Sequence, residues 1–120
     1  MKLILDTNFL MSVTQLNIDI FSEFEKTCNF KYELVIIDQT IDELEKIIAE
    51  GKGKDKYAAK IAIALIKAKG VKKIKGKADN VDDSIVAEIG AVATNDKKLI
   101  ERLKGRKVVR IRAKKYLIVQ

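Results

Sequence analysis

The sequence predicts a single α/β domain, residues 1–120, built on a mostly parallel sheet with helices on both faces. Short apolar runs typical of strands alternate with amphipathic stretches of helical spacing along the whole chain. No linker, repeat or low-complexity tract interrupts this alternation, and 120 residues suit one ordinary domain with its own core. Strands that alternate with helices in this way form parallel sheets that are covered on both faces.

The expected strands are brief apolar runs, and the first two stop at an acidic residue. The run Lys2–Leu5 ends before Asp6, and the run Leu34–Ile37 ends before Asp38. The remaining expected strands are Val71–Ile74, Ala91–Thr94, Val108–Ile111 and Tyr116–Val119.

The expected helices carry apolar residues three or four positions apart, so that one face of each is apolar. Ile18, Phe21 and Phe24 show this spacing in the first helix, and lysines lie opposite the apolar face of the third. The glycines of Gly51–Lys54 separate the second helix from the third. The expected helices are Asn17–Asn29, Thr40–Glu50, Asp55–Lys69, Val81–Gly90 and Lys97–Leu103.

Absent residue types exclude several kinds of chemistry. The chain has no His, no Trp and no Pro, and its single Cys is Cys28. A Ser–His or Cys–His nucleophilic pair is therefore excluded, as is general acid–base catalysis by His. Ordinary zinc sites and intramolecular disulfides are excluded as well. Any catalysis must use carboxylates, hydroxyls or lysines.

Charge is divided unevenly along the chain, whose formal net charge is +7. Residues 1–50 have a net charge of −6, whereas residues 51–120 have a net charge of +13. Such asymmetry indicates an anionic partner, nucleic acid or a membrane surface, although a solvated lysine-rich surface is the simpler alternative. No apolar run approaches the roughly 20 residues that span a bilayer, and the start of the chain lacks a secretory signal pattern. We therefore expect a cytoplasmic protein.

Acidic residues follow the ends of the expected strands. Asp6 and Asp96 come after two strands, Glu43 lies in the first turn of the helix after a third, and the pair Asp82-Asp83 begins a short helix. Because functional groups gather at the carboxyl ends of parallel strands, these acids are expected to meet at one edge of the sheet. A cluster of four carboxylates is tolerated only with a hard divalent cation, since like charges repel one another.

Each of these acids also has a purely structural interpretation. Asp6 and Asn8 can cap a turn, and Thr40 with Glu43 matches a capping box. Asp82 or Asp83 can begin its helix as the N-cap, and so can Asn95 or Asp96. Capping and metal binding do not exclude each other, so the spacing alone supports a metal site only in part.

Four segments resemble the motifs of PIN-domain nucleases, and they occur in the order found in that family. Ile4–Leu10 resembles the opening strand motif, and Ile41–Leu44 resembles the helix motif in which an acid precedes a leucine. Asp82–Ala87 is similar to the third motif, an Asp at the start of a helix. Ala93–Leu99 is similar to the fourth, a strand that leads into Thr-x-Asp. Together they cover most of the chain.

The resemblance implies a three-layer α/β/α sandwich and cleavage of RNA phosphodiester bonds with one or two Mg²⁺ or Mn²⁺ ions. The implied metal-site and catalytic acids are Asp6, Glu43, Asp83 and Asp96, with Asp82 as the other candidate for the inward-facing acid of its pair. The implied supporting polar groups are Asn8, Thr94 and Asn95. The acidic doublet with Thr-Asn-Asp is closer to the archaeal and eukaryotic branch linked to ribosomal RNA processing than to bacterial toxins.

A mechanism follows from these residue types. Carboxylate oxygens prefer Mg²⁺ or Mn²⁺ to zinc or copper, and a bound ion makes a nucleophile of its water without any His. We expect Asp6 and Asp96 to be the principal ligands, with Glu43 and Asp83 holding metal-bound water. Thr94 would position a ligand or contact the phosphate.

The basic half then supplies a surface for RNA, because lysine and arginine contacts to phosphates give affinity with little sequence specificity. The expected contact residues are Lys52, Lys54, Lys97, Lys98, Arg102, Arg106, Arg110 and Arg112.

Three function classes stay open. The first is a ribonuclease of RNA processing or quality control, acting on single-stranded RNA. The second is the ribonuclease toxin of a toxin–antitoxin pair, with an antitoxin as partner. The third is a non-catalytic RNA-binding or assembly module with a ribosome-assembly partner. Homodimerisation is common in the family, and no membrane partner is expected.

Overall fold

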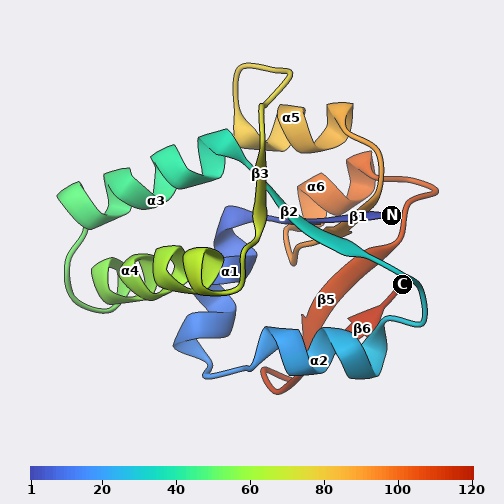
Figure 1. Cartoon of the computed structure of the whole chain (residues 1–120), viewed down its shortest axis with the longest axis horizontal. Helices are drawn as coiled ribbons and strands as arrows, with labels where there is room; N and C mark the ends of the chain where they lie inside the picture. Colours follow the sequence, from blue (N-terminus) through green and yellow to red (C-terminus); the bar gives the residue numbers. More distant parts are fainter.

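Six short strands form one sheet in a computed structural model that describes all residues, 1–120. They are β1 (Lys2–Leu5), β2 (Glu33–Ile37), β3 (Lys72–Ile74), β4 (Ala91–Ala93), β5 (Val108–Arg112) and β6 (Tyr116–Val119). Their order in the sheet is β3-β2-β1-β4-β5-β6 (Figure 1). All neighbouring pairs are parallel except β5 and β6, which form an antiparallel hairpin at one edge. The mostly parallel sheet is thus confirmed.

Six helices connect the strands, and one of them was not expected. They are α1 (Thr7–Gln15), α2 (Ile20–Thr27), α3 (Asp38–Glu50), α4 (Gly53–Ala68), α5 (Val81–Ala87) and α6 (Lys97–Arg102). The interpretation of the segment after Asp6 as a turn is wrong, because α1 begins directly after that residue. Asn8, Ser12 and Gln15 form a narrow polar stripe on α1, whereas Phe9, Leu10, Met11 and Val13 are buried around most of the rest of the helix.

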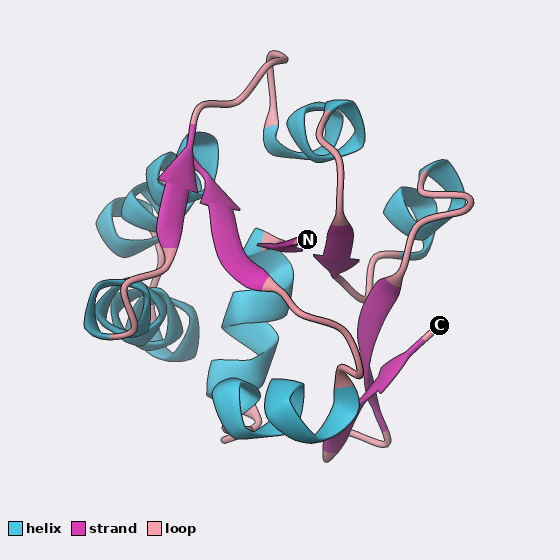
Figure 2. Ribbon diagram, turned by 45° about the vertical axis from the view of Figure 1, so that its right-hand side comes forward, coloured by secondary structure: helices cyan, strands magenta, loops and turns pink.

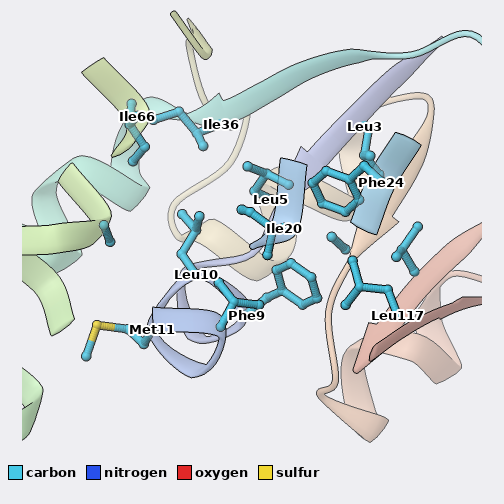
Figure 3. Close-up of a cluster of buried hydrophobic side chains, with 14 of the residues drawn as sticks. Leu3, Leu5, Phe9, Leu10, Met11, Ile20, Phe24, Ile36, Ile66 and Leu117 are labelled. Carbon is cyan, nitrogen blue, oxygen red and sulfur yellow. The ribbon is translucent and has the colours of Figure 1, made fainter. Parts of the chain in front are cut away.

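Side chains on the strands alternate between two cores, because successive residues of a strand point to opposite faces. Leu3 and Leu5 join a cluster formed with α1, α2 and α4, whereas Ile4 joins a smaller one formed with α5 and α6. Helices accordingly lie on both sides of the strands (Figure 2). This arrangement confirms the three-layer α/β/α sandwich. In the larger core the rings of Phe9 and Phe24 stack 6.2 Å apart (Figure 3).

The chain reverses its direction of travel across the sheet at β1. From β1 it proceeds to β2 and β3, then returns to β4 on the other side of β1. In open parallel sheets, ligands bind at the carboxyl ends of the strands that flank such a switch point. Asp6 directly follows β1 and Thr94 directly follows β4, and both therefore lie at this position.

None of the helices is long and apolar enough to cross a membrane.

Candidate functional site

A polar cavity of about 370 Å³ opens at the switch point. Four separate segments contribute to it, namely the residues that follow β1, those that follow β4, the middle of α3, and the start of α5. Its lining residues are Asp6, Thr7, Asn8, Glu43, Lys46, Ile47, Asn80, Val81, Asp82 and Asp96. The structure therefore brings together acids that lie up to 90 positions apart in the sequence.

Asp6 is held at the bottom of the cavity by the neighbouring strand. Its backbone amide donates to the carbonyl oxygen of Ala93 at 3.1 Å, which extends the pairing of β1 with β4 by one residue. The buried Thr94 donates from Oγ1 to Oδ2 of Asp6 at 2.9 Å, and the Asp96 amide donates to the same hydroxyl at 3.1 Å. The Thr94 hydroxyl thus links Asp6 to the backbone of Asp96 and supports both residues.

Asp6 as a whole residue is only 4% exposed. Burial raises its pKa from 3.8 to about 6; the hydrogen bond from Thr94 opposes that rise, and the negative charges of Asp82, Asp96 and Glu43 add to it. Because three carboxylates repel Asp6, the cavity concentrates negative charge at this position.

Glu43 reaches the cavity from α3, and its carboxylate is held by α1. Thr7 donates from Oγ1 to Oε1 of Glu43 at 2.6 Å, and Thr40 Oγ1 lies 3.2 Å from the Thr7 hydroxyl. The capping-box interpretation is wrong, because α3 begins at Asp38 and Thr40 lies inside the helix. Sequence analysis missed Thr7; its place directly after Asp6 at a strand end was the available signal.

The structure separates Asp82 from Asp83. Val81 and Ile85 are buried against the sheet, so this side of α5 faces inward. At about 100° per residue, Asp82 then points sideways into the cavity, whereas Asp83 lies about 200° from Val81 on the outer side. Asp82 lines the cavity and Asp83 does not.

Different neighbours surround the two carboxylates. Arg102 donates from Nη2 to Asp83 Oδ1 at 2.7 Å, and Asn80 Nδ2 donates to Oδ2 at 3.0 Å. These bonds hold the pKa of Asp83 below its usual value, while burial and the charge of Asp96 raise the pKa of Asp82. The expectation that Asp82 or Asp83 is the N-cap of α5 is wrong. Asn80 is the N-cap, and its Oδ1 accepts a hydrogen bond from the Asp83 amide.

Asp96 is both the N-cap of α6 and a lining residue of the cavity. Its Oδ1 accepts hydrogen bonds from the Lys98 and Leu99 amides at 2.9 and 3.2 Å, so the expected N-cap of α6 is confirmed. The same side chain lines the cavity beside Asp6. Of the expected supporting groups, Asn8 also lines the cavity, whereas Asn95 points away from it.

Asn95 instead binds the next strand. Ile111 donates from its amide to Asn95 Oδ1 at 2.7 Å, and Asn95 Nδ2 donates to the Ile111 carbonyl at 3.0 Å. The amide side chain of Asn95 thereby pairs with the backbone of Ile111 as a neighbouring strand would, and it holds the end of β5 against the segment between Thr94 and Asp96.

Asn95→Ala is expected to lower the free energy of unfolding by about 1–2 kcal/mol, because two hydrogen bonds are lost together. Thermal or urea unfolding measures the loss. Asn8→Ala is a suitable comparison, since Asn8 makes no hydrogen bond with its side chain, and a loss of equal size there would contradict the anchoring role.

The cavity offers oxygen donors and no nitrogen or sulfur ligand. Four carboxylates face it, and Lys46, which sequence analysis did not predict, is the only basic residue in its lining. No three acidic side chains are placed so that they could hold one ion directly between them. The arrangement suits a hard cation that retains part of its water shell, because Mg²⁺ usually binds through one or two carboxylates and several waters.

Most of the expected RNA-contact residues are exposed, but some already have partners within the protein. Lys52, Lys54, Lys97, Lys98 and Arg112 are exposed and make no ion pair. Arg102 pairs with Asp83, and Arg110 donates to Gln120 Oε1 at 3.3 Å.

Arg106 binds backbone carbonyl groups within the protein. Its guanidinium donates to the carbonyl oxygens of Gly90 and Ile85 at 2.8 and 3.0 Å, which fastens the carboxyl end of α5. Arg106 is therefore unsuited to the phosphate contact expected of it.

Comparisons with known proteins agree with this architecture. A family model described as a PIN-like domain matches residues 3–114. Ribonuclease VapC4 of Methanocaldococcus jannaschii is 37% identical over 124 residues, which cover 96% of this chain and 93% of that protein. The solved structure of the PIN domain endonuclease Utp24 is similar with a TM-score of 0.81 and 26% identity, covering 99% of this chain and 90% of that one.

Proposed function

This chain belongs to the PIN-like domain family, and from that premise we propose that it is a divalent-metal-dependent endoribonuclease. The observation that carries the proposal is the cavity at the switch point, where Asp6, Glu43, Asp82 and Asp96 converge from four segments. Mutual repulsion within this group is offset when a cation binds, and the resulting site attracts a phosphodiester.

Mg²⁺ or Mn²⁺, as one or two ions, is the cofactor that the donor set fits. Asp6 and Asp96 would be the principal ligands, while Glu43 and Asp82 would hold water of the ion's shell. Asp83 takes no part in this assignment, because its carboxylate is bound to Arg102 on the outer side of α5.

The protein's own groups orient the reaction. A bound ion would supply a nucleophile from water at neutral pH and offset charge on the phosphate. Thr94 holds Asp6 through a 2.9 Å bond, and Thr7 holds Glu43 through a 2.6 Å bond, so both carboxylates present their free oxygens to the cavity. No histidine is needed for any part of this chemistry.

Glu43→Gln is expected to lower Mn²⁺-dependent cleavage of single-stranded RNA by about 10- to 100-fold, the usual effect of removing an outer ligand group. Cleavage rates with Mn²⁺, Mg²⁺ and a chelator provide the measurement. Glu45→Gln on the same helix is the matched control, because Glu45 is exposed and does not line the cavity. Equal rates for the two variants, or undiminished cleavage in chelator, would contradict the proposal.

We assign the activity to RNA processing or quality control. The toxin of a toxin–antitoxin pair is a second candidate, and the 37% identity to Ribonuclease VapC4 favours it. Expression of the chain with and without a small acidic protein encoded next to it separates these roles. Growth arrest that only the second protein relieves would favour the toxin.

A further inference from the structure

We propose that the outer face of the β5–β6 hairpin is the platform that holds single-stranded RNA beside the cavity. This hairpin platform consists of Arg112 and Tyr116 with the turn residues Lys114 and Lys115. The inference rests on the proposed function, because it gives that site its path for the substrate strand.

The strands of the hairpin have one covered and one open face. Ile111, Leu117 and Val119 turn toward the larger core. Arg112 and Tyr116 point to the opposite side, and they are directly paired across the two strands. Because β6 is the last strand of the sheet, no further strand borders it (Figure 1), and Tyr116 is 44% exposed. An arginine therefore lies beside an exposed aromatic ring.

The charge of this region is uniform. From Arg102 to Gln120 the chain carries eight basic residues and no acidic one. Arg102 and Arg106 are taken up by Asp83 and by backbone carbonyls, whereas Arg112, Lys114 and Lys115 are exposed and form no ion pair. Positive charge that follows a backbone, combined with an aromatic ring on which a base stacks, is the usual design of single-strand binding surfaces.

The hairpin is joined to the catalytic cavity through Asn95. Its two hydrogen bonds to Ile111 place Arg112 one residue away from a segment that carries both Thr94 and Asp96. A single-stranded RNA whose scissile phosphate lies at the carboxylates of the cavity would then extend over the nearby hairpin platform.

The turn itself has an unfavourable sequence for its shape. Three residues, 113–115, separate the paired Arg112 and Tyr116, and Ala113 and Lys114 have φ angles of 54° and 57°, a left-handed conformation that residues other than Gly and Asn rarely adopt. A lysine at this costly position suits a functional role better than a folding role.

The test measures binding separately from cleavage. The full chain is titrated in EDTA against a labelled single-stranded oligouridylate, with vesicles rich in phosphatidylserine as the comparison ligand. The variant R112Q/K114Q is compared with K56Q/K60Q on α4, which removes the same charge from exposed positions elsewhere. Tyr116→Leu is compared with Tyr57→Leu, the other exposed tyrosine.

We expect R112Q/K114Q to bind RNA about tenfold more weakly than K56Q/K60Q, with a salt slope reduced by about 0.7 for each lost phosphate contact. Tyr116→Leu is expected to weaken binding about tenfold with an unchanged salt slope. Equal affinities of the hairpin and α4 variants would overturn the platform, as would a wild-type chain that binds vesicles but no RNA. A wild-type chain that binds RNA through the hairpin yet fails to cleave it with Mn²⁺ supports the platform and refutes the nuclease.

Discussion

Asp6→Asn is expected to stabilise the metal-free protein at neutral pH while lowering RNA cleavage on the order of 100-fold. The cleavage loss follows because a principal carboxylate of the proposed metal site is removed. The gain in stability follows because a neutral amide replaces a buried carboxylate that Asp82, Asp96 and Glu43 repel.

The pH dependence has a definite sign. The pKa of Asp6 is raised by burial from 3.8 to about 6, so the folded state binds a proton more tightly than the unfolded state. Wild-type stability therefore falls as pH rises from about 4 to about 6, by up to roughly 3 kcal/mol, and stays lower above that range. Asp6→Asn removes this contribution, so the variant's advantage is largest above pH 6.

Urea unfolding in EDTA at pH 5 and pH 7.5 measures this difference, and added Mn²⁺ is expected to stabilise wild type more than the variant. Asp79→Asn is the control, because Asp79 is exposed and forms no ion pair. A variant less stable than wild type at pH 7.5 would contradict the account of Asp6.

Asp82→Asn and Asp83→Asn form the second pair with large expected differences. Although the residues are adjacent, only Asp82 lines the cavity. Asp82→Asn is expected to lower Mn²⁺-dependent cleavage about 10- to 100-fold, whereas Asp83→Asn is expected to change it by less than about threefold.

Asp83→Asn instead breaks the ion pair with Arg102 and lowers stability slightly. Initial cleavage rates at saturating Mn²⁺, with unfolding curves for both variants, distinguish the two effects. Equal losses of cleavage, or the larger loss in Asp83→Asn, would overturn the assignment of Asp82.

Much of the fold follows from local pattern. The strand Lys2–Leu5 was predicted with its exact bounds, because a short apolar run ending at an acid needs no distant information. Helix α1 was not predicted, because Phe9, Leu10, Met11 and Val13 are buried on several sides. The sheet and α4 cover most of α1 and leave only the narrow stripe of Asn8, Ser12 and Gln15, and this burial depends on parts of the chain far away.

The sequence contains part of the information that distinguishes Asp82 from Asp83. Val81 and Ile85, four positions apart, mark the inward side of α5, and that spacing alone would have favoured Asp82 over Asp83. The family motif favoured Asp83 instead, and only the packed helix shows which carboxylate Arg102 binds.

The sequence by itself determined the chemistry available to this protein. Without His and with a single Cys, it leaves carboxylates, hydroxyls and lysines for any catalysis, and its charge is divided between an acidic first part, residues 1–50, and a basic remainder. Tertiary structure alone decided which side chains are free. Arg106 is bound to Gly90, Asn95 to Ile111 and Thr7 to Glu43, pairs between 16 and 36 positions apart. Such contacts arise only when the folded chain brings distant segments within hydrogen-bond distance, so no local pattern encodes them.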